Sequence, residues 1–125
     1  MGKLERGIIM KKETLDQAKE LYGDKACHAL EKMYDRFGFQ KTFFVRKGTK
    51  EIPEGKYLHL DWMEAVFVPA SVKKIGKNAF TEKPGHPVFI VYGGTVNQWE
   101  QIDLDDSIKA IPCVNCLDGT KMYHL

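Results

Sequence analysis

The cysteine and histidine residues are the ones in this 125-residue chain whose types and spacing could best support chemistry. Cys113-x-x-Cys116 has the spacing of half a zinc site, to which Cys27, His28 and His124 could add ligands. A structural zinc site needs four ligands, however, and no second pair stands at finger spacing. Positions three apart on a regular strand also face opposite sides, so the two thiols converge only if the strand bends. We expect no metal and no cofactor, and we keep a zinc-stabilised nucleic-acid or protein binder built on Cys113 and Cys116 as the alternative.

No group of residues predicts catalysis. Cys27 and His28 are adjacent in a helical stretch, so their side chains diverge by about 100° and cannot pair as nucleophile and base. The acidic run "DLDD" at 103–106 lacks the glycine and the distal glutamate of a calcium loop. "YGG" at 92–94 is not followed by the lysine and serine of a phosphate-binding loop. We therefore expect a protein that is not an enzyme.

The composition favours a single soluble globular domain. Hydrophobic residues make up 43% of the chain and charged residues 29%, and its length suffices to bury one core. The 19 basic and 17 acidic residues are spread along the chain, without the concentrated basic patch that nucleic-acid binding requires. No apolar run approaches the roughly 20 residues of a membrane span, and the N-terminus lacks the apolar middle of a signal peptide. We expect a cytoplasmic protein, or an extracellular one if a leader has been removed, with a protein partner rather than nucleic acid or membrane. The oligomeric state is not predicted.

The elements that would position a site fall into two halves, and the first is helical. Thr14 and Gln17 have the spacing of a capping box. Apolar residues then recur at helical spacing up to about Phe37, and Gly38 stands where a glycine ends a helix. Gly23 either divides this segment into two helices or weakens a single one.

Beyond residue 38, short β-rich runs recur with a 23-residue period. "FFV" begins at Phe43, "VFV" at Val66 and "FIV" at Phe89, and the next step reaches Pro112 within "IPCVNC". The connecting segments match as well, because "KEIPEGKY" starts at Lys50 and "KKIGKNAF" starts one period later, at Lys73. A unit of this length cannot bury its own apolar face, so neighbouring units stack into a parallel sheet.

These patterns predict an α/β fold. An N-terminal helix or helix pair over residues 1–38 is followed by a short leucine-rich-repeat-like solenoid with a small parallel sheet over residues 39–125. We expect one compact domain, in which the N-terminal segment either caps the first repeat or covers the sheet.

Three segments resemble one known family, the BspA-like leucine-rich repeats. "VFVPASVKKIGKNAF" is similar to its repeat, "VYGGTVNQWEQI" to its terminal segment, and "IPCVNCLDG" to its closing Cys-x-Asp-Gly strand and turn. The resemblance covers Val66 to Gly119, weakens over Lys50 to Ala65 and does not include the N-terminal helices. Lys83 also departs from the pattern, since the family often has cysteine there. The resemblance implies a solenoid used for protein contacts, often on bacterial surface proteins, and it does not imply an enzyme.

The predicted sheet has an outward face that could bind a partner. Side chains alternate between the two faces of a strand, so residues one 23-residue period apart should form columns across the outward face. The first column is Phe44, Phe67, Ile90 and Cys113, and the second is Arg46, Pro69, Tyr92 and Asn115. An exposed apolar column of this kind marks a contact surface. We predict that the partner-binding residues are Phe44, Arg46, Phe67, Ile90 and Tyr92.

Whether this surface is open depends on the N-terminal helices. They could lie across the first column, and the binding surface would then move to the loop "TEKPGHP" at 81–87 and to Tyr92. We favour an open or partly open column, because arginine and tyrosine are common at interface hot spots. The expected function is a small intracellular inhibitor or adaptor that acts by steric contact, such as a phage- or mobile-element-borne antagonist of a host enzyme.

Overall fold

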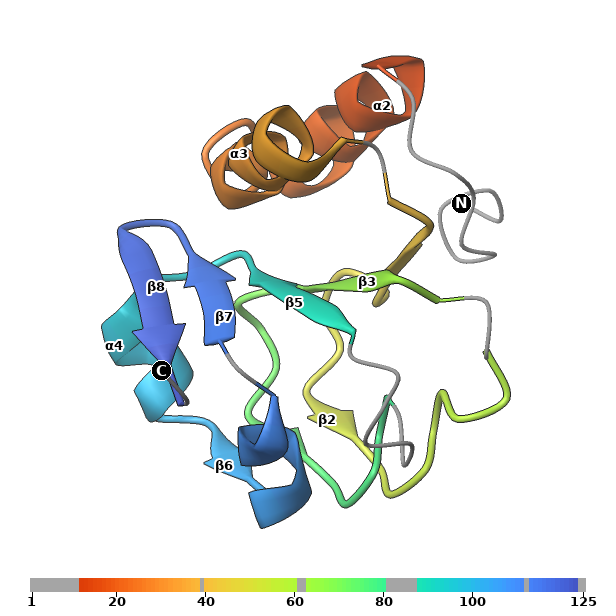
Figure 1. The fold of residues 1–125 in the computed structure, drawn as a ribbon, viewed down its shortest axis with the longest axis vertical. Coiled ribbons are helices and arrows are strands. Elements are labelled where there is room, and N and C mark those ends of the chain that lie inside the picture. Colours follow the sequence, from red (N-terminus) through yellow and green to blue (C-terminus); the bar gives the residue numbers. More distant parts are fainter. Residues whose placement is uncertain (1–11, 39, 61–62, 81–87, 112, 124–125) are drawn as a thin grey trace.

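The computed structural model describes residues 12–38, 40–60, 63–80, 88–111 and 113–123, which form a mixed α/β fold (Figure 1). The helices are α2 (Lys12–Tyr22), α3 (His28–Phe37), α4 (Val96–Glu100) and the 3-10 turn η1 (Asp106–Ala110). One sheet contains β1 (Thr42–Phe44), β3 (Ala65–Val68), β5 (Phe89–Tyr92), β7 (Cys113–Cys116) and β8 (Gly119–Met122). A smaller sheet contains β2 (Glu51–Ile52), β4 (Lys74–Ile75) and β6 (Asp103–Leu104).

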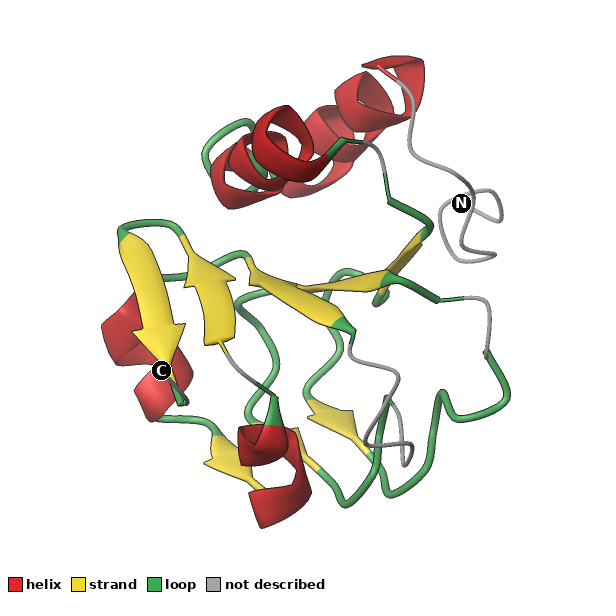
Figure 2. Cartoon of the chain, viewed as in Figure 1, coloured by secondary structure: helices red, strands yellow, loops and turns green. Residues whose placement is uncertain are grey.

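The larger sheet is mostly parallel, as predicted. Its strand order is β1-β3-β5-β7-β8, and only the last pair, β7 and β8, is antiparallel. The three strands of the smaller sheet are also parallel, and they lie opposite the larger sheet (Figure 2). Apolar side chains fill the space between the two sheets. This inner core includes Val66, Val68, Ile75, Ile90, Tyr92, Trp99 and Val114.

The turns that connect the two sheets repeat the same backbone geometry. Ile52 and Ile75 are partners in the smaller sheet, and both are buried. Gly55 and Asn78 occupy equivalent places in successive repeats, and both have positive φ angles, of 63° and 51°. Gly76 lets successive turns approach closely, because a Cβ atom there would lie 2.6 Å from the backbone nitrogen of Glu54.

The N-terminal segment is a helix pair, which settles the role of Gly23. Its φ of +96° is incompatible with a continuous helix, and it separates α2 from α3. Gly38 ends α3 with a φ of +82°, and its N–H donates to the carbonyl of Tyr34 at 2.8 Å. The pair lies over the face of the larger sheet that is remote from the smaller sheet (Figure 1). It covers that face instead of capping the first strand.

The predicted repeat period holds for only one strand pair of the larger sheet. Phe44 is the partner of Phe67, one period later, but Phe67 is the partner of Val91, which stands one residue beyond the next period. The following pair has the same extra residue, since Val91 is the partner of Asn115. A slip of one residue moves a side chain to the other face. Our assignment of Ile90 and Tyr92 to the outward face is therefore wrong, because both belong to the inner core.

The close approach at Gly76 gives a stability prediction. We expect Gly76→Ala to lower the free energy of unfolding by about 2 kcal/mol, because the new methyl group overlaps rigid backbone of the preceding turn. The exposed neighbour Lys77 provides the control, and Lys77→Ala should change the value by less than about 0.5 kcal/mol. Urea unfolding monitored by circular dichroism measures both, and equal stability of the two variants would contradict the turn geometry.

Candidate functional site

The predicted partner-binding residues are buried, with one exception. Phe44 and Phe67 have no exposed surface, and Ile90 and Tyr92 each retain only 1%. Arg46 is exposed. The open apolar column is therefore a wrong prediction, because helices α2 and α3 cover Phe44 and Phe67 and the inner core contains Ile90. Tyr92 of the second column also belongs to the inner core, whereas Cys113 of the first column stays partly exposed.

Two tyrosines attach the helix pair to the first strand. The hydroxyl of Tyr22, at the end of α2, donates to the carbonyl of Val45 at 2.8 Å. The hydroxyl of Tyr34, on α3, hydrogen-bonds the buried hydroxyl of Thr42. The Tyr22 ring also lies 4.8 Å from the ring of Phe67, measured between centroids. Thr42 is the first residue of β1 and Val45 directly follows its last, so each helix has a directed bond at one end of this strand in addition to its apolar contacts.

The apolar surface that stays exposed lies at another edge of the same sheet face. The large hydrophobic side chains exposed among the described residues are Phe37 (50%), Phe89 (37%) and Met122 (49%). Met122 pairs with Cys113 across β7 and β8, and the register of β5 with β7 places Phe89 beside Cys113. The ring of Phe37 stacks on that of Phe89 at 5.3 Å between centroids. We call Phe37, Phe89, Cys113 and Met122 the apolar strip.

A groove continues from the apolar strip between α3 and the β7–β8 hairpin. It has a volume of about 170 Å³, and its walls are formed by Ala29, Lys32, Met33, Arg36, Phe37, Asn115, Cys116, Gly119 and Thr120. Lys32 and Arg36 lie one helical turn apart on α3, and both side chains are exposed. The Arg36 guanidinium lies 5.4 Å from the centroid of the Phe37 ring. The groove therefore has two cationic side chains and no carboxylate among its lining residues.

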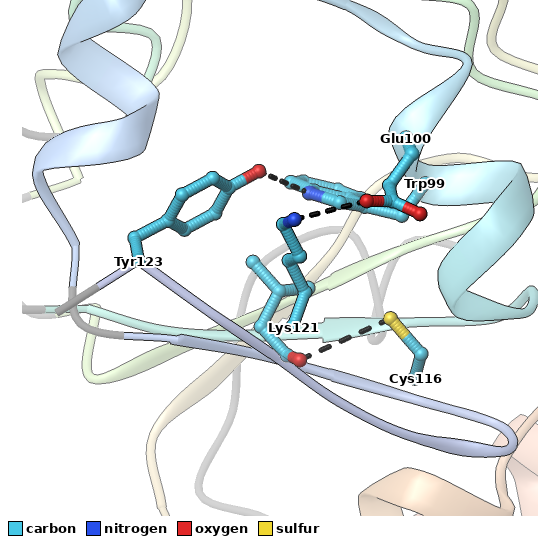
Figure 3. Close-up of polar contacts among 6 residues, drawn as sticks. Trp99, Glu100, Cys116, Lys121 and Tyr123 are labelled. Atoms are coloured by element: carbon cyan, nitrogen blue, oxygen red, sulfur yellow. Dashed lines mark hydrogen bonds and ion pairs between the residues drawn. The ribbon is translucent and has the colours of Figure 1, made fainter. Parts of the chain in front are cut away.

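The opposite face of the hairpin is attached to α4, and this fixes which β8 side chains face the groove. The Trp99 indole N–H donates to the Tyr123 hydroxyl at 2.8 Å, and the Lys121 ammonium lies 2.9 Å from a Glu100 carboxylate oxygen (Figure 3). Lys121 and Tyr123 therefore face α4. Side chains alternate along a strand, so Thr120 and Met122 face α3 and the apolar strip.

The cysteine arrangement does not favour the zinc alternative. Cys116 is buried in the inner core, whereas Cys113, three positions earlier on the same strand, is half-buried on the opposite face. No cluster of three or more histidine, cysteine, aspartate or glutamate side chains suited to a metal occurs within the described ranges. His124 and the loop 81–87, both considered above, lie outside those ranges.

Sequence reasoning missed most of this surface. Phe37 appeared only as a core position of a helix, and Phe89 only as the start of a strand. Thr120 and Met122 escaped notice because no strand was predicted after residue 119. The available signal was Asp118-Gly119, a dipeptide typical of tight hairpin turns, followed by the alternating run "TKMY". Gly119 has the φ of +150° that favours glycine at this turn.

The three thiols should differ in reactivity. Burial raises the pKa of Cys27 to about 11 and that of Cys116 to about 12, so at pH 8 both stay protonated and shielded. Only the partly exposed Cys113 should react rapidly with a maleimide at this pH. Mass spectrometry of the native protein should show one fast addition, and Cys113→Ser should abolish it. Rapid labelling of Cys27 or Cys116 would contradict the packing described here.

A search of family models finds no match to this chain, and neither a curated protein nor a solved structure matches it significantly. No helix within the described ranges is long and apolar enough to cross a membrane. The resemblance to BspA-like leucine-rich repeats therefore stays a prediction drawn from the motifs.

Proposed function

We propose that this protein is a non-enzymatic binding module that recognises a protein partner through the apolar strip. The observation that carries the proposal is the exposure of two stacked phenylalanines and a methionine on one continuous surface. Single exposed apolar side chains are common, but a contiguous exposed apolar patch marks a contact surface, and aromatic residues and methionine are enriched in protein interfaces. Arg36 beside Phe37 adds a residue type common at hot spots.

The elements that carry the strip suit binding without rearrangement. Phe89, Cys113 and Met122 belong to adjacent strands of one sheet, and Phe37 ends a helix that packs against β5 and β7. Their backbone is therefore held by the sheet hydrogen bonds and by the core beneath it. A surface ordered before binding loses little conformational entropy when a partner docks.

We further propose that the sheet portion is a short solenoid of the BspA-like leucine-rich type. Three features support this. Parallel strand partners in the larger sheet are separated by one repeat period or by one residue more, Gly55 and Asn78 share a left-handed backbone conformation, and the terminal segment is closed by specific contacts. In that segment Thr95 and Gln98 form a capping box at the start of α4, and the Asp118 carboxylate accepts from the N–H of Val96 at 2.9 Å. These contacts give physical roles to the motif residues that carry the resemblance.

A steric inhibitor or adaptor remains our interpretation of what binding achieves. The buried thiols of Cys27 and Cys116 have raised pKa values, which is the reverse of what a nucleophilic cysteine requires. A partner bound at the apolar strip would lie against the ends of α3 and β8. In that position this protein could cover a functional surface of the partner.

The double substitution Phe37→Ser and Phe89→Ser tests the proposal. We expect capture of the native partner from a lysate of the source organism to be lost, because the apolar contacts at the centre of the interface are removed. The free energy of unfolding should fall by less than about 2 kcal/mol, since both side chains are already partly exposed in the folded protein. Affinity capture with quantitative mass spectrometry and urea unfolding provide the two measurements.

The matched control is Glu54→Ser with Lys77→Ser, two exposed residues in the turns beside the smaller sheet. This variant should capture the same partner as the unmodified protein. If the strip variant stays folded and captures an unchanged set of proteins, the strip is not the binding surface.

A buried position provides a second contrast. Phe67→Asp places a carboxylate beneath the helix pair, among the apolar side chains that cover this face of the sheet. We expect the melting temperature to fall by roughly 10 °C or more for a domain of this size. A stable Phe67→Asp protein that no longer captures the partner would instead support the open column predicted from the sequence.

A further inference from the structure

We propose that the apolar strip and the adjoining groove bind an acidic segment of the partner protein. An apolar side chain of that segment would rest on Phe37, Phe89 and Met122, and its carboxylates would lie against Lys32 and Arg36. This inference rests on the proposed function and adds the chemistry of the partner.

The two groove cations lack an ion-pair partner within the described residues, unlike several cations elsewhere. Lys19 pairs with Glu31, Lys109 with Asp106 and Lys121 with Glu100, at N–O distances between 2.9 and 3.9 Å. No described carboxylate lies within ion-pair distance of Lys32 or Arg36. Complementary charge at an interface steers association and fixes orientation, so two adjacent unpaired cations favour an acidic ligand.

The shape of the groove favours a chain segment over an enclosed small molecule. Its volume of about 170 Å³ is below the roughly 300–1,000 Å³ of typical small-molecule sites. It opens onto the apolar strip through Phe37, which lines both. A segment lying along this surface can therefore place an apolar side chain and a carboxylate at the same time.

The groove also offers groups that suit carboxylates. The Arg36 guanidinium lies over the Phe37 ring, an arrangement that orients its planar group while leaving its edge N–H donors available. Asn115 and Thr120, which hydrogen-bond each other at 3.4 Å, supply neutral polar groups on the facing wall. The apolar strip beside these cations distinguishes the site from a surface suited to phosphates alone, where continuous positive charge is expected.

The charge of the chain's own N-terminus does not match the groove. Residues 1–11 contain Lys3, Arg6 and Lys11 against a single acidic residue, Glu5. Like charges facing each other across a contact disfavour binding, so this segment is a poor occupant of a cationic groove. We therefore commit to an acidic segment from a partner.

Two fluorescein-labelled peptides of equal length test the inference. Both carry leucine and phenylalanine at the same positions, and the remaining positions are glutamate in one and lysine in the other. Fluorescence anisotropy with the full chain should show at least about tenfold tighter binding of the glutamate peptide at low salt, and this preference should shrink at high salt. Equal affinity for the two peptides, or no binding of the glutamate peptide, would overturn the inference.

Variants locate the effect. Lys32→Glu with Arg36→Glu should weaken the glutamate peptide at least about tenfold and improve the lysine peptide, whereas Lys50→Glu with Lys77→Glu, an equal charge change beside the smaller sheet, should change neither. Phe37→Ser with Phe89→Ser should weaken the binding of both peptides.

Equal effects of the two charge reversals on peptide affinity would mean that binding depends only on the net charge of the protein. Tighter binding of a single-stranded DNA than of the glutamate peptide, at matched charge, would assign the groove to phosphate. Either result would overturn the inference.

The native partner separates this inference from the proposed function. If the strip variant loses the partner and the groove reversal does not, the binding function stands and the acidic chemistry is wrong. If both variants retain the partner, the proposed function itself is wrong.

Discussion

The central sheet carries apolar side chains on both faces, and the rest of the architecture follows from the need to bury them. All four residues of β3 are buried, two facing each side. Burying one large apolar side chain contributes roughly 1.5–3 kcal/mol, so leaving Phe44, Phe67 and Val91 in water would forgo several kcal/mol. The turns and the smaller sheet cover one face, and the helix pair covers the other. Parallel sheets generally require such cover on both sides.

The extent of that cover determines where the candidate site lies. Tyr22 and Tyr34 fasten the helix pair to β1, at one edge of the sheet, and α3 reaches across to β5 and β7. The final strand, β8, extends the sheet beyond the helices. Phe89, Cys113 and Met122 therefore remain partly exposed beside Phe37, while the equivalent side chains on β1 and β3, Thr42 and Ala65, are fully buried. The apolar strip is the part of this face that the two helices leave uncovered.

Sequence reasoning was reliable where several residues repeat one signal. The amphipathic helices and the four parallel strands follow from periodicity, and these parts of the prediction are confirmed. Ile52 and Ile75 are buried as expected, but they lie in β2 and β4 of the smaller sheet, where only connecting turns were predicted. The predicted site was placed wrongly, because a register shift of a single residue decides which face of the sheet a side chain lies on. One extra residue in each of the later connections moved Ile90 and Tyr92 into the inner core and brought Val91 under the helices. This longer spacing cannot be read from three short apolar runs, since each run is apolar at consecutive positions.

Whether the outward face of the sheet is exposed could not be predicted from the sequence either, because it depends on how the helices pack against the sheet. The stripe on α2 and α3 predicts an apolar face but does not specify its partner. Tyr22 and Tyr34 fit a helix stripe, yet their hydroxyl bonds to Val45 and Thr42 join residues that only the tertiary fold brings together. Predicting the apolar strip also required predicting the β7–β8 hairpin, which the Asp118-Gly119 turn could have indicated.

Solvent accessibility measured by NMR tests the central claim most directly. A soluble nitroxide added to the isolated protein broadens the side-chain resonances that solvent can reach. The structure predicts strong broadening for Phe37, Phe89 and the Met122 methyl group, with Phe44, Phe67 and Val91 protected. Broadening of Phe44 and Phe67 equal to that of Phe37 would contradict the account, because it would mean that the helix pair leaves the sheet face open.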